Sequence, residues 1–90
     1  MWITGQVVDE AGRALSGVIV EAFGLEMIRR AVVSDVHGHY VMQGLPAGAY
    51  TITFTRSGFA TLQRQIERLS TYVATINARL QTGAVARSSD

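Results

Sequence analysis

Residues 49–55 read AYTITFT, and this stretch decides the fold class. Tyr50, Ile52 and Phe54 alternate with threonines, so the apolar side chains lie on one face of an extended chain and the hydroxyl groups on the other. A period of two residues is typical of a strand that buries one face of a sheet. We therefore predict that residues 49–55 form a half-buried β-strand.

A tight corner precedes this strand, because residues 44–48 read GLPAG. Pro46 restricts its own φ and biases Leu45 toward extended geometry. This arrangement suits a corner at which Leu45 inserts into the core, and Gly48 then lets the chain enter the strand. Tyr50 offers a large apolar surface and a hydroxyl group that needs a partner when it is buried.

The segments before this corner repeat the same organisation of short β-prone runs between turns. Alternation of side chains recurs in WITGQVV (2–8), GVIVEAF (17–23) and HYVMQGL (39–45), and IRRAVVS (28–34) is a less regular strand. Turn signals separate the runs at residues 9–12 (DEAG), 16–17 (SG), 35–38 (DVHG) and 56–58 (RSG). Regularly spaced turns between short strands predict a β-sandwich or barrel.

Residues 59–80 allow two interpretations. Their apolar positions also follow the three-and-four spacing of a helical seam, at Phe59, Leu62, Ile66, Leu69, Val73, Ile76 and Leu80. Against a helix, the segment TYVATIN (71–77) is rich in β-branched and aromatic residues, which lose side-chain freedom in a helix. A strand face fits Tyr72, Ala74, Ile76, Ala78 and Leu80. Beyond this segment we predict that residues 82–90 form a flexible tail or the start of a linker.

The composition fits one globular domain and excludes several classes of function. The chain of 90 residues is 48% apolar and 17% charged, with a formal net charge of +1, which offers no basic surface to a nucleic acid. The absence of cysteine excludes disulfides, thiolate nucleophiles and cysteine metal sites. No apolar run reaches the roughly 18 residues of a membrane span, and the start MWITGQVVDE lacks the features of a signal peptide. We expect no membrane insertion by this domain, and if the protein is exported, this chain is a piece of it.

The glycines, aspartates and aromatic residues fall into a recognisable order over nearly the whole chain. The order begins with ITGQVVD (3–9), Gly12 and LSGVIV (15–20), and continues with SD (34–35), Gly38, Tyr40, GLPAGAYT (44–51) and GF (58–59). These motifs resemble the carboxypeptidase regulatory-like domain. The ending NARLQTGAVA (77–86) is similar to the segment that follows this module at the N-terminus of some TonB-dependent outer-membrane receptors.

The resemblance implies an all-β, seven-stranded Greek-key sandwich of the transthyretin (prealbumin) type over residues 1–81. It also favours strands over a helix beyond Phe59. Structural roles are implied for Gly5, Asp9, Gly12, Gly17, Asp35, Gly38, Tyr40, Leu45, Pro46, Gly48, Tyr50, Gly58 and Phe59.

The same resemblance implies a non-catalytic structural or interaction module of a larger exported protein, in particular the periplasmic N-terminal domain of a TonB-dependent receptor. The expected partners are neighbouring domains of the same polypeptide or another protein, on the periplasmic or extracellular side. A self-assembling sandwich is an alternative, and the sequence does not define the oligomeric state.

Both histidines lie in the stretch SDVHGHY (34–40). On a strand, His37 and His39 would share one face and could begin a zinc site with Asp35, so a small metal- or ligand-binding carrier that uses these histidines is a second alternative. However, Gly38 lies between the histidines, and the resemblance makes this stretch a turn. We expect Asp35 to cap that turn through its own backbone, and we expect no metal or other cofactor.

Catalysis finds no support in the sequence. The serines have no recognisable base, and no G-x-S-x-G elbow is present. The tyrosine-arginine-glycine-serine ending of the urate-pathway hydrolase, an enzyme with a related sandwich, is replaced here by RSSD (87–90). All eight basic residues are arginine, so the lysine that forms an isopeptide bond in similar adhesin domains is missing. We expect no catalytic residue and no enzyme activity.

The alternation also predicts which apolar side chains point outward. Trp2, Ile19, Phe23 and Val73 are candidate interface residues if they cluster, whereas scattered exposed apolar residues are ordinary. Edge strands offer a second route to a partner through their unpaired backbone groups. In the third run, Arg29 and Arg30 could guard such an edge by their charge.

Overall fold

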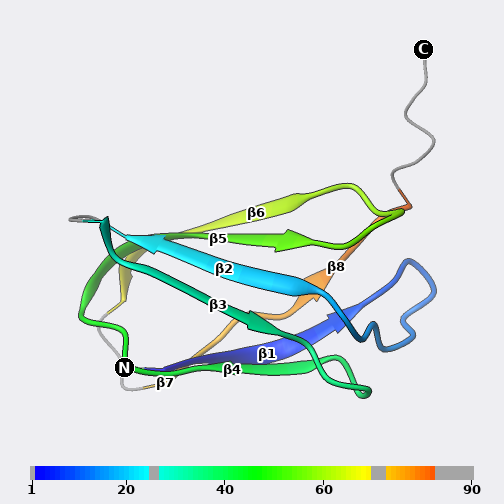
Figure 1. The fold of residues 1–90 in the computed structure, drawn as a ribbon, viewed down its shortest axis with the longest axis horizontal. Helices are drawn as coiled ribbons and strands as arrows, with labels where there is room; N and C mark the ends of the chain where they lie inside the picture. The colour runs from blue at the N-terminus through cyan, green and yellow to red at the C-terminus, as the bar shows by residue number, and fades with distance from the viewer. Residues whose placement is uncertain (1, 25–26, 70–72, 83–90) are drawn as a thin grey trace, which may run out of the picture.

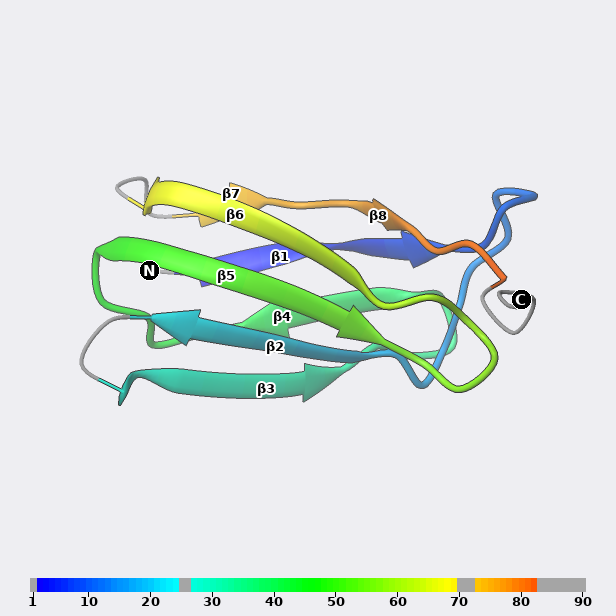
Figure 2. The same ribbon diagram turned by 90° about the horizontal axis from the view of Figure 1, so that it is seen from above.

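The computed structural model describes residues 2–24, 27–69 and 73–82. Within them, two β-sheets pack face to face (Figures 1 and 2). The strands are β1 (Trp2–Val8), β2 (Ile19–Gly24), β3 (Arg29–Val33), β4 (His39–Met42), β5 (Gly48–Thr55), β6 (Leu62–Leu69), β7 (Val73–Thr75) and β8 (Ala78–Arg79). The prediction of an all-β sandwich is confirmed, and no helix in the described residues is long and apolar enough to cross a membrane.

The chain crosses repeatedly between the two sheets. One sheet has the order β4-β1-β7, with β8 also paired to β1, and the other has the order β3-β2-β5-β6. The second sheet is antiparallel throughout, whereas β1 pairs in parallel with β7 and β8. Crossings at the β1–β2, β3–β4, β4–β5 and β6–β7 connections bring distant segments together, so β5 lies beside β2.

The strand count is one place where the sequence prediction was wrong. We expected seven strands, but the described residues form eight, because the last run is divided at Ile76 and Asn77. Ile76 N–H still donates to Thr4 O at 2.8 Å. At the next position, the Asn77 side-chain oxygen accepts the Gln6 N–H at 2.9 Å, so a side chain takes a position that backbone pairing would otherwise fill.

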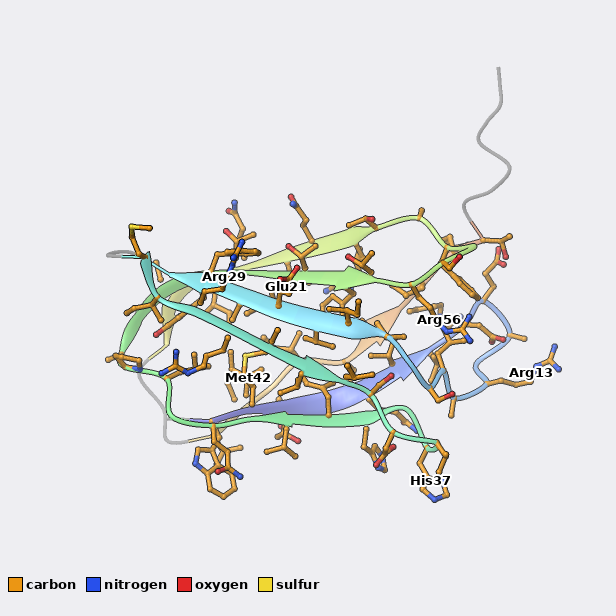
Figure 3. The ribbon with its side chains drawn as sticks, viewed as in Figure 1. Arg13, Glu21, Arg29, His37, Met42 and Arg56 are labelled. Carbon is orange, nitrogen blue, oxygen red and sulfur yellow. The ribbon has the colours of Figure 1, made fainter. Side chains whose placement is uncertain are left out.

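The core lies between the inner faces of the two sheets and follows the predicted alternation. β2, β4 and β5 each bury every second residue along part of their length, as a pleated chain requires, and β1 buries Ile3 and Val7 on one face. Tyr40 from one sheet meets Phe54 from the other edge to face, with ring centroids 5.9 Å apart. Figure 3 shows Met42 pointing into the space between the sheets. The buried apolar residues are Ile3, Val7, Leu15, Val18, Val20, Ala22, Tyr40, Met42, Leu45, Tyr50, Ile52, Phe54, Ala78 and Leu80.

The helical interpretation of residues 59–80 is wrong in the described part, where this segment forms β6, β7 and β8. Leu62 and Ile66 lie opposite Phe54 and Tyr50 of β5, which fixes them on the inner face. Val73, a core position of the helical seam, is instead 45% exposed. The segment therefore forms strands and not a helix, because β6 pairs with β5, and β7 and β8 pair with β1. Tyr72 lies outside the described residues.

Two further predictions concern the edges and the end of the sandwich. β3 is an edge strand, and it carries Arg29 and Arg30 with both side chains exposed. At the C-terminal end, Thr82 forms a β-bridge with Phe59, and Ala60 N–H donates to Gln81 O at 2.9 Å. Thr82, which the sequence placed in the tail, is therefore part of the sandwich. The remaining predicted tail, residues 83–90, lies outside the described residues.

Candidate interaction surfaces

The stretch with the two histidines is a turn held by Asp35. The N–H groups of His37 and His39 both donate to Asp35 Oδ1 at 2.9 Å, and Gly38 N–H donates to Asp35 O at 2.9 Å. These bonds, first that from His39 and then that from His37, hold the pKa of the Asp35 carboxyl below its usual value. Gly38 has φ +76°, and a Cβ there would lie 2.4 Å from Val7 O.

The two histidine rings are tilted relative to each other and are not gathered with Asp35 into one group of potential metal ligands. Their ring centroids are 6.3 Å apart, and the His37 ring projects away from the sandwich (Figure 3). One oxygen of Asp35 is already engaged by two backbone donors. Among the described residues, no group of three or more His, Cys, Asp or Glu side chains is arranged to hold a metal ion.

The turn after β1 has the same construction. Asp9 Oδ1 accepts the N–H groups of Ala11 and Arg13 at 2.9 Å, and Asp9 O accepts the Gly12 N–H at 3.0 Å. The bond from Arg13 is the main cause that lowers the Asp9 pKa. The two D-x-x-G motifs of the sequence are therefore two copies of one capped turn.

The corner before β5 is held by Tyr50. Its hydroxyl donates to Pro46 O, and Leu45 is buried beside it. Burial raises the Tyr50 pKa. Gly48 opens β5 with φ +150°.

A second tyrosine anchors the divided last run to β4. The Tyr40 hydroxyl donates to Ile76 O, and burial raises the Tyr40 pKa. Gly5 lies against the same carbonyl, since a Cβ at Gly5 would be 1.9 Å from Ile76 O. The position therefore has no room for a side chain.

The other predicted structural residues lie in two loops. Gly17 has φ +74° in the loop between β1 and β2, where Arg56 Nε donates to Ser16 O at 2.8 Å. Gly58 has φ +86° in the turn between β5 and β6. The ring of Phe59 in that turn lies under the Arg56 guanidinium, with 5.5 Å from Cζ to the ring centroid.

Sequence reasoning missed the role of Ser34, which is the buried polar side chain of the described core. It is only 4% exposed. Its hydroxyl donates to Leu15 O at 2.7 Å and accepts the Val18 N–H at 2.9 Å. One side chain thereby satisfies both ends of the loop that enters β2. The available signal was a small polar residue that ends a β-branched run and belongs to the SD motif (34–35).

The four candidate interface residues do not form one patch. Trp2 and Val73 are cross-strand partners on the outer face of the β4-β1-β7 sheet, where they are 37% and 45% exposed. Ile19 and Phe23 lie on the outer face of the other sheet. Ile19 is exposed, but Phe23 is half-buried under Arg29, whose Cζ lies 5.0 Å from the ring centroid. The sandwich therefore separates the predicted interface into two pairs on opposite sides.

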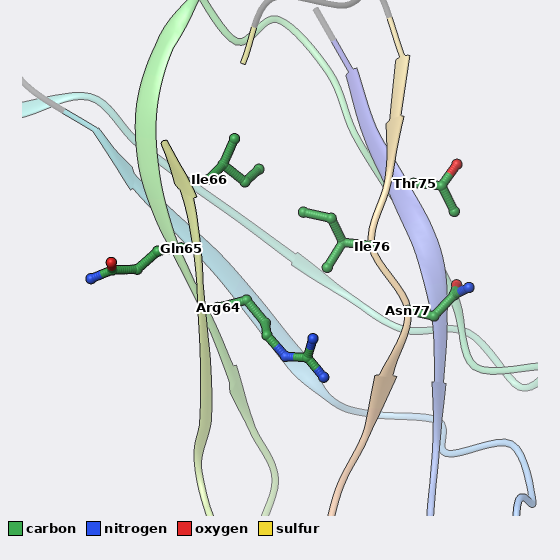
Figure 4. A pocket seen from close by; sticks show the side chains of 6 residues that line it. All are labelled: Arg64, Gln65, Ile66, Thr75, Ile76 and Asn77. Carbon is green, nitrogen blue, oxygen red and sulfur yellow. The ribbon is translucent and has the colours of Figure 1, made fainter. Parts of the chain in front are cut away.

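A groove that the sequence did not predict follows the side of the sandwich where β6 faces β7 and β8. We call it the lateral groove. One part has a volume of about 390 Å³ and the next about 290 Å³, and both include Arg64 and Asn77. Figure 4 shows Ile66 and Ile76 pointing toward one another and the Arg64 guanidinium extending into the groove, while Gln65 points away. The remaining lining residues are Gln6, Val8, Thr75, Ala78 and Arg79.

The fold and these sites define a class: a transthyretin-like, two-sheet sandwich whose distinctive polar residues cap turns and anchor loops. The family follows from the sequence, since the model of the carboxypeptidase regulatory-like domain matches residues 2–81. The chain belongs to this family, and the predicted resemblance is confirmed at that level.

Solved structures with similar folds come from several kinds of protein. Klebsiella pneumoniae 5-hydroxyisourate hydrolase is 18% identical with a TM-score of 0.73, over 91% of this chain and 90% of that one. A catechol 1,2-dioxygenase from Acinetobacter radioresistens is 16% identical with a TM-score of 0.75, over 99% of this chain and 54% of that one. The Bacillus anthracis TIE protein is 17% identical with a TM-score of 0.74, over 90% of this chain but 16% of that one.

At these identities the likeness concerns the fold alone. The chain spans 58% of a Rhodococcus opacus 3-chlorocatechol 1,2-dioxygenase and only a small part of the Bacillus anthracis protein. A search of curated proteins gives no match.

Proposed function

We propose that this sandwich is a non-catalytic structural and interaction module of a larger exported protein, and specifically the periplasmic N-terminal domain of a TonB-dependent receptor. The family assignment supports the module, and the motif order with the ending NARLQTGAVA supports the receptor. Similar sandwiches also occur as small parts of longer chains, including 32% of a streptococcal ancillary pilin at 18% identity and a TM-score of 0.70.

One observation carries the proposal: the side chains that looked chemically distinctive are engaged in architecture. Asp9 and Asp35 cap turns, Ser34 joins two backbone groups, and Tyr40 and Tyr50 anchor carbonyls. A nucleophile or general base needs a side chain positioned toward a substrate. These groups are directed at the chain itself, which favours a scaffold.

The surface provides the contacts that such a module needs. The Trp2–Val73 pair presents apolar area on an outer face, and Val41 of β4 is 46% exposed on the same face. In our proposal this face packs against the neighbouring domain of the same polypeptide. The rigid sheets hold that face in position, and neither a nucleic acid nor the membrane interior is a partner.

Cell fractionation tests the location and the host protein. Antibodies against the 90-residue chain are used to probe the cytoplasmic, periplasmic and outer-membrane fractions of the source bacterium. We expect a band much larger than this chain in the outer-membrane fraction. A free chain of this size in the cytoplasm would overturn the proposal.

Photo-crosslinking in the intact host protein tests the contact face. A photoreactive residue replaces Val73, and Val33 on the outer face of the other sheet serves as the matched control, since both are exposed strand positions. We expect an intramolecular crosslink from position 73 only. Crosslinks from position 33 alone would assign the neighbour to the other face.

A further inference from the structure

We infer that the free edge of β6 and the lateral groove bind an extended segment of a partner protein that carries a carboxylate opposite Arg64. This inference rests on the proposed interaction role and names the chemistry of the partner. The segment would add to β6 as a further strand.

The first support is the position of β6 at the end of its sheet. In the described residues β6 pairs with β5 on one side, and its order in the sheet leaves the other side open. Alternate residues of such an edge direct their N–H and C=O groups away from the sheet, where a partner strand can pair with them. Just before Leu62 the chain is already paired, because Phe59 forms a β-bridge with Thr82 and Ala60 N–H donates to Gln81 O. The open edge is therefore a bounded segment beside a groove.

The second support is the direction of Arg64. It lies opposite Ile52, which is fully buried, so it occupies an inner-face position of β6. Its neighbours on that face, Leu62 and Ile66, are half-buried and pack against the core. A cation on the inner face of an edge strand opposes the addition of an apolar strand. A segment with a carboxylate at that position would neutralise the cation and make charge-assisted hydrogen bonds to it.

The third support is that the described chain does not provide this carboxylate. The ion pair within the described residues joins Arg13 to Asp9 in the turn after β1, with 3.8 Å between Nε and Oδ2. Arg64 makes no ion pair within the described residues. Arg79 adds a second guanidinium to the groove. The Glu10 carboxylate accepts the hydroxyl and N–H of Thr82. The groove is thus basic, and an acidic segment complements it.

A second copy of the chain is a poorer occupant for a geometric reason. Two β6 strands that pair antiparallel in one continuous sheet place residues of the same face opposite each other. The partner of Arg64 would then be an even-numbered residue of the other copy. In the part of β6 that pairs with β5 in regular register, these positions are Leu62, Arg64 and Ile66, and none of them is acidic.

The inner face of β6 also predicts the pattern of the segment. Leu62, Arg64 and Ile66 follow one another along that face, so a complementary strand has an apolar, an acidic and an apolar residue at alternate positions. The peptide TVTETVT has this pattern. TVTQTVT is its neutral control, TVTKTVT reverses the charge, and TVTETVT with methylated amides on the pairing edge keeps the carboxylate but cannot form the ladder.

Titration of the full 90-residue chain with these peptides, followed by amide NMR, tests the site. We expect TVTETVT to shift amides in residues 62–66 and 76–79, and to bind at least about fivefold more tightly than TVTQTVT, a modest ratio because Arg64 is exposed. The methylated peptide should not bind. Arg64→Gln should remove the preference for TVTETVT, and Arg64→Glu should transfer it to TVTKTVT. Arg29→Gln on the β3 edge is the matched control and should change nothing.

The outcomes separate this inference from the proposed function. Equal binding of the glutamate and glutamine peptides, shifts confined to the β3 or β4 edge, or no binding would overturn the acidic-segment site. If the β6 amide signals shift with protein concentration in the absence of peptide, the edge mediates self-association, and this result would also overturn the acidic-segment site. The NMR spectrum of each variant reports its folding directly. None of these results tests the proposed function as a module of an exported receptor, which the fractionation experiment tests separately.

Discussion

Removal of the Ser34 hydroxyl should destabilise the sandwich far more than its size suggests. The side chain is 4% exposed and makes two hydrogen bonds, one to Leu15 O and one from the Val18 N–H. Backbone bonds from Ser34 N–H to Val18 O and from Gly17 N–H to Ser34 O remain in Ser34→Ala, so the loop stays in place. The carbonyl and the N–H are then left buried without their partner.

The magnitude follows from the two lost bonds. At about 1 kcal/mol of net stability for each, and more where an unsatisfied group stays dry, we expect a loss of at least about 2 kcal/mol. For a domain of this size, that loss corresponds to a fall in Tm of about 8–16 °C. It is a large part of the roughly 5–13 kcal/mol that stabilises a chain of this length.

Urea and thermal unfolding of Ser34→Ala, followed by circular dichroism, measure this loss. The matched control is Ser16→Ala in the same loop, because Ser16 is exposed and its described bond uses the backbone carbonyl. We expect the control to change stability by less than about 0.5 kcal/mol. Hydrogen exchange at the Val18 amide should become faster in Ser34→Ala only. Equal stabilities of the two variants would refute the reasoning.

Three further predictions concern the turns and the anchor of the last run. Gly5→Ala should destabilise the domain by about 1–3 kcal/mol or more, because the new Cβ would lie 1.9 Å from Ile76 O. Since this oxygen is a backbone atom, a change of side chain cannot relieve the clash. In urea unfolding, adding Tyr40→Phe to Gly5→Ala should therefore not restore the lost stability. Tyr40→Phe leaves Ile76 O without its donor and should lower stability by about 1–3 kcal/mol, and a loss no larger than that of an exposed substitution would count against this anchor. Asp9 and Asp35 have folded pKa values below their unfolded values, so their stabilisation is present above about pH 4 and is lost as the pH falls through the folded pKa. In unfolding experiments from pH 6 to pH 2, the double variant Asp9→Asn and Asp35→Asn should therefore depend less on pH, and an unchanged slope would contradict the capping role.

The inner faces of the strands were predictable from the sequence, since burial with a period of two is local information. Tyr50, Ile52 and Phe54 are buried as the alternation predicts, and the corner buries Leu45. The helical alternative for residues 59–80 could not be excluded locally, because Leu62 and Ile66 satisfy both spacings. Pairing with β5 decides between them, and that pairing depends on residues from a distant part of the chain.

The surfaces were less predictable, because they depend on how the sheets are placed. Trp2 and Ile19 share an outward alternation, but only the topology shows that they lie on opposite sides. The lateral groove joins β6 of one sheet to β7 and β8 of the other, so neither segment alone predicts it. The available signal for the groove was Arg64, a charged residue at an inner-face position of β6. That position could not be assigned while a helix was still an alternative for this segment.

The parallel pairing of β1 with β7 and β8 has a mechanical consequence. β1 begins at one end of the long axis and the described residues finish at the other, so tension between the two ends runs along these strands (Figure 1). Such a pull slides β1 past β7 and β8 and loads all their hydrogen bonds together, whereas a hairpin pulled from its open end would unzip one bond at a time. The domain should therefore transmit stretching force as a stiff link before it yields.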